Sequence, residues 1–401
     1  AETLSTEIFN DHVIRTIYRI NQSGFYVPGY KNDSEEREFD FLLPVKPEFL
    51  AQIDPRDIPR FFTYELIGER LKVSFQNASM EKPKTKEFNT IARTKTEGKI
   101  VQMGKDFDYP FLVGVFPHLK VINEDGSSHQ DYNDFYKICL AVDGGGNPTH
   151  LKTDNFSLEF FRKGDGVLEK ITSEGRTYNA MREVRRKFES PDALASIYYQ
   201  VNGTTFDLIK INIQNVDGLD NVTGMIVPKW KEKRVGDKRF DFSVDFGTTN
   251  TFVAYTDDPE HRTMPKPFDI SLNELQMVML QHSPEARGGL SVTDSFWRNT
   301  GIAQLVKLLL ANEFVPPVFL PGEAGSVFTM PFRTAVFQKK NINTFNLFSD
   351  LNVHFGYQKT IIDQNAIEWQ EIIANLKWNV SSLGDLGAKY RVEKFIEELC
   401  M

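Results

Sequence analysis

A short polar turn between two apolar segments contains the residues whose types and spacing favour a particular chemistry. Apolar and polar side chains alternate over residues 240–245, which end on Asp245, and a second apolar segment begins near Thr251. Gly247, between them, has no side chain to block a close approach to the main chain. Backbone N–H groups and threonine hydroxyls can hold phosphate oxygens, and a carboxylate at the strand end can hold Mg²⁺ directly or through water. The pattern therefore predicts a site for a phosphate group and its Mg²⁺.

The segment Val244-Asp-Phe-Gly-Thr-Thr-Asn-Thr251 resembles the first phosphate motif of the superfamily that joins actin, the seventy-kilodalton heat-shock chaperones and the sugar kinases. It is most similar to the chaperone form, in which this turn joins two antiparallel strands of the first lobe. The resemblance implies that Asp245 is the carboxylate on the Mg²⁺ side. It also implies a phosphate loop with these members: Gly247, Thr248, Thr249, Asn250 and Thr251. An ordinary polar hairpin is the alternative interpretation.

Three downstream segments extend the resemblance. Residues 330–337, Gly356–Lys359 and Ile372–Lys377 correspond to a strand, a Gly-x-x-Lys segment and a helix of the chaperones. The resemblance implies that Lys359 is a candidate catalytic lysine, which would help to position phosphate and the attacking water. A lysine that only faces solvent is the alternative at that position.

The resemblance implies a nucleotide as the ligand, with ATP and Mg²⁺ as cofactors. The superfamily's second phosphate loop, Asp-x-Gly-Gly-Gly, does not occur after residue 256, and Asp143-Gly-Gly-Gly146 precedes the first motif and is expected to be an ordinary loop. We therefore expect full ATP binding and hydrolysis only in a complete protein with two lobes, of which this chain is the N-terminal portion, inactive alone and with at most very weak binding of Mg-ATP. The alternatives are an interaction or scaffold protein with an inactive actin-like part, and a small-molecule kinase.

The elements around this motif predict an α+β chain of two parts. Residues 1–235 are predicted to be a β-rich domain, and residues 236–401 a partial actin-like (ribonuclease H-like) α/β lobe. The basic run Lys229–Arg239 separates them and is interpreted as a solvated linker, with an anion-binding patch as the alternative. The role of the β-rich domain is not visible in its sequence, although its position suggests a protein partner or regulation of the second part.

Periodicity and turn signals predict the individual elements of the β-rich domain. Helices are predicted over Thr6–Ile20 and from Ser190 to about Val201. The segments Tyr136–Val142 and 156–160 alternate in polarity and are predicted to form a hairpin across the glycine-rich loop. Further strands are predicted over three segments: Phe111–Val115, Phe206–Ile213 and Val222–Val227.

The second part is predicted to mix strands and helices. After the phosphate turn, a strand is expected over Pro331–Phe337, and helices are expected over three segments: Gly301–Ala311, Ala366–Leu376 and Leu386–Leu399. The last residues, Glu393–Met401, keep a helical pattern without a glycine cap, which predicts that the chain has been cut there.

Composition limits the remaining classes of function. The net charge of −8 argues against a general nucleic-acid binder, which normally carries a basic face. Cys139 and Cys400 are too few for a disulfide framework and favour a reducing compartment. The chain opens without a signal-peptide pattern, and no apolar run reaches the roughly 18 residues that a membrane span needs. A cytoplasmic protein without membrane or nucleic-acid partners is the expectation.

Overall fold

The computed structural model describes the following residues: 8–16, 18–32, 37–91, 97–102, 111–129, 135–142, 155–164, 167–172, 182–186, 195–202, 204–216, 219–257, 264–268, 278–281, 331–339, 353–355, 370–374, 376–379, 389, 391–393 and 395–396. Strands dominate them, so the structure is mostly β; the predicted α+β class is not confirmed, and an actin-like fold is not shown. The chain divides into two compact units. The first unit is Ala1–Val235 with Met277–Leu305, and the second is Gly236–Gln276 with Val306–Met401.

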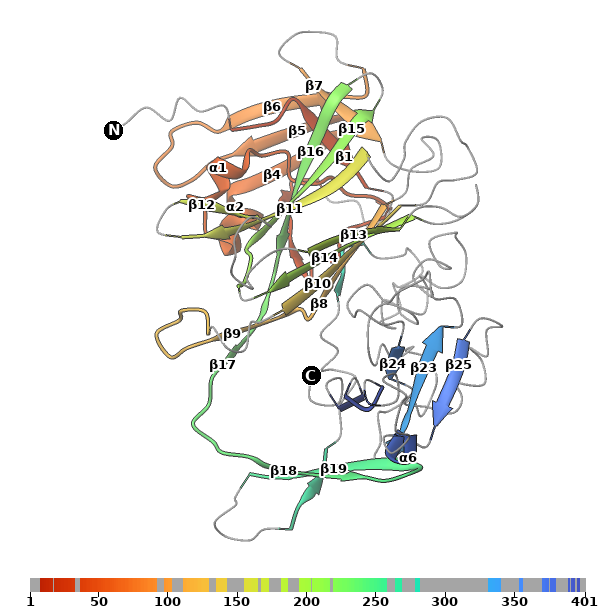
Figure 1. Cartoon of the computed structure of the whole chain (residues 1–401). Coiled ribbons are helices and arrows are strands. Elements are labelled where there is room, and N and C mark those ends of the chain that lie inside the picture. Colours follow the sequence, from red (N-terminus) through yellow and green to blue (C-terminus); the bar gives the residue numbers. More distant parts are fainter. Residues whose placement is uncertain are drawn as a thin grey trace. The chain divides into compact units, whose positions relative to one another are not determined.

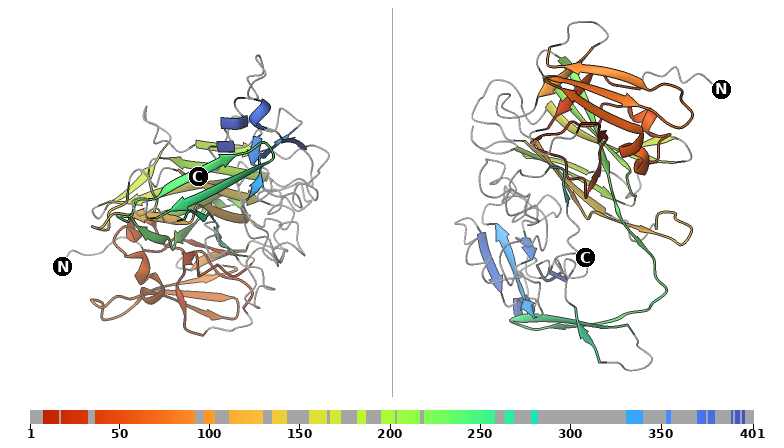
Figure 2. Two further views of the ribbon diagram at one scale, coloured as in Figure 1. Left: turned by 90° about the horizontal axis from the view of Figure 1, so that it is seen from below. Right: turned by 180° about the vertical axis from the view of Figure 1, so that it is seen from behind.

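The first unit contains three sheets of five or six strands (Figures 1 and 2). The six-stranded sheet has the order β1 (His12–Arg15), β7 (Gly98–Gln102), β6 (Lys84–Asn89), β5 (Arg70–Phe75), β4 (Phe62–Ile67), β3 (Gly29–Tyr30). The middle sheet has the order β12 (Leu168–Ile171), β11 (Phe156–Lys163), β15 (Leu208–Val216), β16 (Leu219–Pro228), β2 (Phe25–Tyr26). The outer sheet has the order β13 (Arg182–Arg186), β14 (Ala195–Asn202), β10 (Phe135–Val142), β8 (Phe111–Phe116), β21 (Val278–Met279).

Shorter elements complete this unit. Strands β9 (Leu119–Ile122) and β17 (Lys231–Arg234) form a parallel pair. Two short helices, α1 (Pro47–Leu50) and α2 (Ile58–Phe61), flank the 3-10 turn η1 (Pro55–Asp57). The exposed side chains of β17 agree with a solvated basic run, although this part of the run is a strand.

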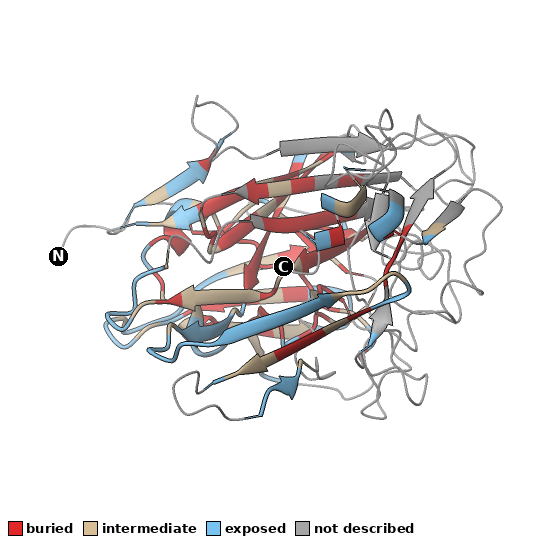
Figure 3. Ribbon diagram, turned by 60° about the horizontal axis from the view of Figure 1, so that its bottom comes forward, coloured by how far each residue is buried: buried red, intermediate tan, exposed pale blue. Residues whose placement is uncertain are grey.

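Two apolar cores cover the two faces of the middle sheet. Ile226 of β16 packs with the outer sheet in one core, whereas its neighbours Met225 and Val227 pack with the six-stranded sheet in the other. A strand that is covered on both faces is continuously apolar rather than alternating. Buried residues follow the strands of the unit accordingly, and Figure 3 shows them in red.

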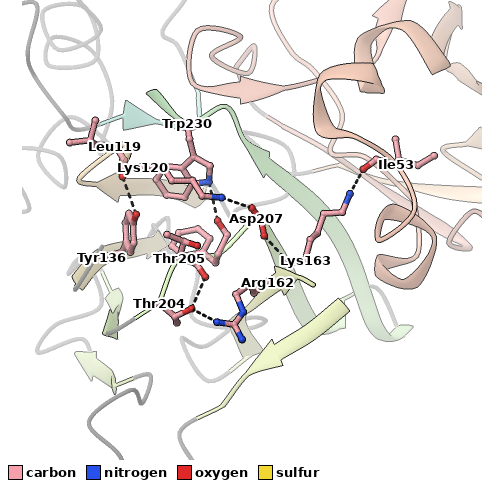
Figure 4. Close-up of polar contacts among 11 residues, drawn as sticks. Ile53, Leu119, Lys120, Tyr136, Arg162, Lys163, Thr204, Thr205, Asp207 and Trp230 are labelled. Atoms are coloured by element: carbon pink, nitrogen blue, oxygen red, sulfur yellow. Dashed lines mark hydrogen bonds and ion pairs between the residues drawn. The ribbon is translucent and has the colours of Figure 1, made fainter. Parts of the chain in front are cut away.

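A carboxylate just before β15 links this strand of the middle sheet to neighbouring segments (Figure 4). Asp207 accepts hydrogen bonds from the Lys120 ammonium at 3.1 Å and from the backbone N–H of Lys163 at 2.7 Å. The Lys163 ammonium donates in turn to the carbonyl of Ile53. Both charged side chains of the Lys120–Asp207 pair are largely buried. Their pairing offsets part of the free energy that burial of an unpaired charge would cost.

Three predictions for the first unit are wrong. The helix over Thr6–Ile20 is replaced by β1, in which Val13 and Ile14 are both fully buried but in different cores. When each face of a strand packs against a core of its own, two adjacent residues are both apolar. This pattern is easily mistaken for the apolar face of an amphipathic helix. The helix up to Val201 is strand β14, where β-branched and aromatic side chains favour the extended form.

The third wrong prediction is the hairpin between β10 and β11. Strand β10 pairs with β8 and β14, whereas β11 pairs with β12 and β15 in a different sheet. Alternation in polarity identified both strands correctly, but it carries no information about their partners. The strand predictions over Phe111–Val115, Phe206–Ile213 and Val222–Val227 are confirmed as β8, β15 and β16.

The second unit contains two small sheets. One holds β18 (Asp241–Phe246), β19 (Asn250–Thr256), β20 (Lys266–Pro267) and β22 (Phe332–Arg333). The other has the order β24 (Val353–Phe355), β23 (Ala335–Lys339), β25 (Gln370–Ala374), and the short helix α6 (Leu376–Asn379) follows β25.

The strand predicted over Pro331–Phe337 is confirmed in part: the segment is extended, but it divides at Thr334 into β22 and β23, which belong to different sheets. The helix predicted over Ala366–Leu376 is wrong at residues 370–374, which form β25, because Ile372 and Ile373 are β-branched and extend a sheet. Described residues at 389, 391–393 and 395–396 are helical, as predicted. The predicted helix Gly301–Ala311 lies outside the described residues.

Candidate functional site

The predicted phosphate turn joins two antiparallel strands. In the β18–β19 hairpin, Asp245 lies opposite Phe252 and Phe246 lies opposite Thr251, so residues 247–249 form the turn. A Cβ added to Gly247 would lie 2.3 Å from the backbone oxygen of Asn250. Because real Cβ atoms do not approach backbone oxygens so closely, the turn in this conformation requires glycine.

The hydroxyl of Thr248 has a defined orientation. The indole N–H of Trp378, in α6, donates to Thr248 Oγ1 at 3.1 Å. Since an indole can only donate, the threonine oxygen is the acceptor, and the hydroxyl hydrogen remains free to point toward another acceptor. The turn therefore offers a hydroxyl donor that is held by an aromatic side chain from the C-terminal part of the unit.

Thr334, between β22 and β23, contacts Thr249 of the turn and Thr251 of β19. The carbonyl of Thr249 accepts from the backbone N–H of Thr334 at 2.9 Å. The hydroxyls of Thr251 and Thr334 lie 2.7 Å apart and are buried. Thr251 thus anchors the end of the turn through a buried contact, whereas the side chains of Thr249 and Asn250 are exposed.

Asp245 has an exposed side chain at the end of β18. Its neighbour Phe246 points to the other face and packs against Phe395, which is fully buried, with ring centroids 5.5 Å apart. The hairpin is therefore anchored by one face while the carboxylate stays in solvent.

The turn contains the donor types that a magnesium–phosphate group requires, although the fit is partial. Asp245 supplies one carboxylate, and Thr248, Thr249 and the backbone supply donors for phosphate oxygens. Within the described ranges, no group of three or more His, Cys, Asp or Glu residues is placed to hold a metal ion. A Mg²⁺ ion at Asp245 would accordingly keep most of its ligands as water and phosphate, as Mg²⁺ usually does.

Sequence reasoning missed two residues of the site. Trp378 and Thr334 contact the turn from positions far along the chain, and neither belongs to a pattern that predicts a phosphate site. Lys359, the predicted catalytic lysine, and the glycine run at 143–146 lie outside the described residues.

Neither a scan against protein-family models nor a search of the curated proteins found a match for the chain. Among the helices that the structure describes, none has the length and apolar character that a membrane crossing needs.

Proposed function

We propose that the second unit contributes the phosphate-binding turn of a nucleotide-binding protein of the actin, heat-shock chaperone and sugar kinase superfamily. The sequence Asp245–Thr251 carries this proposal together with one observation, the oriented hydroxyl of Thr248 beside a turn that only glycine permits. Donors that are already held in place suit an anion, because they need little rearrangement when it binds.

In this proposal Asp245 holds Mg²⁺ through water. Gly247, Thr248, Thr249 and Asn250 surround the phosphate oxygens, while Thr251 fixes the turn to β22. ATP is the nucleotide, and its hydrolysis belongs to the complete two-lobed protein, in which Lys359 would position the attacking water. The turn alone supplies only part of the contacts of a nucleotide, so we expect this chain to bind Mg-ATP weakly, in the millimolar range.

Ligand-observed ³¹P NMR tests the proposal, because it detects weak binding through line broadening. We expect the chain to broaden the phosphate resonances of Mg-ATP, and the variants Asp245→Ala and Thr248→Val to remove most of the effect. The matched control is Asp241→Ala, since Asp241 lies on the same strand and face but away from the turn, 3.6 Å from Arg239.

Two results would overturn this proposal in whole or in part. Broadening that is absent, or equal in wild type and both turn variants, would exclude a phosphate site at the turn. Micromolar affinity that is lost in Asp245→Ala would show instead that the site is already complete within this chain.

The second candidate is an interaction or scaffold protein. Such a protein would cause no broadening, or equal broadening in wild type and both turn variants. Alternate apolar side chains in β18 and directly before it favour this candidate, because Phe240, Phe242 and Val244 are 45%, 58% and 48% exposed. Neighbouring exposed apolar residues on a strand often mark a protein interface. In that reading the β-rich first unit binds a protein partner and the turn has no catalytic role.

A further inference from the structure

A hollow of about 490 Å³ lies on the solvent face of the six-stranded sheet in the first unit. Thr63 of β4 and Ser74 of β5 lie directly opposite each other in register and form its floor. Their neighbours Tyr64 and Val73 point into the core on the other face. The hollow is therefore built on a rigid part of the sheet, with segment 76–83 at its rim.

Ser74 is the most informative residue of this hollow. It is only 5% exposed as a residue, and its side chain lies on the same face of the sheet as that of Thr63, which also lines the hollow. A serine hydroxyl can both donate and accept a hydrogen bond, so it can hold a phosphate oxygen. The floor of the hollow therefore offers hydroxyl groups to a ligand.

The charges around the hollow favour an anion. Lys31 and Arg60 line it, and no acidic residue is among its described lining residues. The Lys31 ammonium has no partner within the described part of the chain. Arg60 forms an exposed ion pair with Asp57 at 3.2 Å, which contributes little and leaves other guanidinium donors available.

One wall of the hollow is apolar. The ring of Phe61 lies beneath the Arg60 guanidinium, 4.7 Å from it, and Ala78 and Pro83 add further apolar surface. A single phosphate ion would leave this wall uncovered, whereas an organic group would bury it. We propose that the hollow binds a small organic phosphate, with the phosphate at Ser74, Lys31 and Arg60 and the organic group against Phe61.

Titration calorimetry with inorganic phosphate and with phenyl phosphate, at constant ionic strength, tests this site. We expect phenyl phosphate to bind more tightly than inorganic phosphate because its ring covers Phe61. Ser74→Ala and Lys31→Gln should each weaken phenyl phosphate by about tenfold, as expected for a lost hydrogen bond to a charged group. Phe61→Leu should reduce the difference between the two ligands.

Two matched controls keep the test specific. Thr85 lies opposite Ser74 on the neighbouring strand β6 and does not line the hollow, so Thr85→Val should leave the affinity unchanged. Thr248→Val should also leave it unchanged, since that variant removes a hydroxyl from the turn of the second unit and does not alter this hollow. The experiment can therefore exclude the phosphate site in this hollow without excluding the proposed nucleotide site at the turn, and the reverse also holds.

The site is excluded if neither ligand binds saturably in the millimolar range. It is also excluded if Thr85→Val weakens binding as much as Ser74→Ala does. Equal affinity for the two ligands would overturn the assignment of the Phe61 wall to an organic group.

Discussion

The indole N–H of Trp378 donates to the hydroxyl oxygen of Thr248 at 3.1 Å, across 130 positions of the sequence. This bond joins the short helix α6 to the turn between β18 and β19. The turn is therefore held from outside its own hairpin. Since Trp378 is 67% exposed, its indole also lies where a ligand at the turn would change its surroundings.

Fluorine NMR should detect this bond directly. In chain labelled with 5-fluorotryptophan, the resonance that disappears in Trp378→Phe belongs to Trp378. We expect Thr248→Val to shift that resonance, because the valine offers no acceptor, and Thr248→Ser to leave it nearly unchanged. If the chemical shift of that resonance is the same in Thr248→Val as in wild type, the two side chains do not interact in solution.

Replacement of Gly247 should damage the hairpin. The Cβ of alanine would meet the backbone oxygen of Asn250 at 2.3 Å, and backbone cannot move aside as a flexible side chain can. We expect Gly247→Ala to destabilise the hairpin by about 1–3 kcal/mol, a typical cost of overpacking. Amide hydrogen exchange in β18 and β19 measures this loss.

Gly236→Ala is the matched control for Gly247→Ala. Its added Cβ would have no heavy atom closer than 3.9 Å, so exchange in the hairpin should stay at the wild-type rate. Equal protection in Gly247→Ala and Gly236→Ala would contradict the tight turn.

A second glycine should be required in the first unit. A Cβ on Gly224 would lie 2.8 Å from Leu42 Cδ1 and 2.9 Å from Leu42 Cβ, within the packed interior beside β1. Gly224→Ala should lower the free energy of unfolding of this unit by about 1–3 kcal/mol. Urea unfolding followed by NMR resonances of the first unit measures the change.

The comparison for Gly224 is Gly164→Ala. The nearest atom to its added Cβ is 3.8 Å away, so this variant should keep the wild-type midpoint. A Gly224→Ala variant as stable as Gly164→Ala would mean that Leu42 can move without cost.

The first unit should lose stability in mild acid through His118. Burial lowers the pKa of this imidazole below its ordinary value of 6.5, opposed by a hydrogen bond to the carbonyl of Gly24 at 3.0 Å. A lowered pKa means that the unfolded chain binds the proton more readily. The stabilisation is complete above pH 6.5 and is lost as the pH falls from there through the folded-state pKa.

The His118→Gln variant isolates this effect. Glutamine still has an N–H donor for Gly24 but does not titrate, so its urea midpoint should depend less on pH between about pH 8 and about pH 5, where histidines titrate. The comparison with wild type is needed because burial also lowers the pKa of His12. Identical pH dependence in both proteins would exclude His118 as a contributor.

Several strands of the first unit could be predicted from the sequence, including the continuously apolar β8 and β16, but β1 and β14 could not. The alternation at 156–160 correctly indicated β11, while the adjacent buried residues Val13 and Ile14 imitated a helix. Strand partners were also beyond prediction, because the pairing of β10 with β8 and β14 depends on distant segments.

The same limit applied to the candidate site. The glycine and threonines of the turn are contiguous, so their spacing alone indicated a phosphate site. Trp378 and Thr334 reach the turn only through the packing of the second unit, which no local pattern encodes.

The chain also returns to the first unit after leaving it. Residues 278–281 hydrogen-bond on one side to β8, where the Leu280 N–H donates to Val113 O at 2.8 Å. On the other side, the Asn21 N–H donates to Leu280 O at 2.7 Å. Val278 fills the space beside Gly24, where an added Cβ would be 2.2 Å from its Cγ1. Residues 236–276 are thus an insertion between two strands of one domain. A first unit expressed alone should therefore join residue 235 to residue 277 through a linker, because a simple stop at 235 would remove an edge strand.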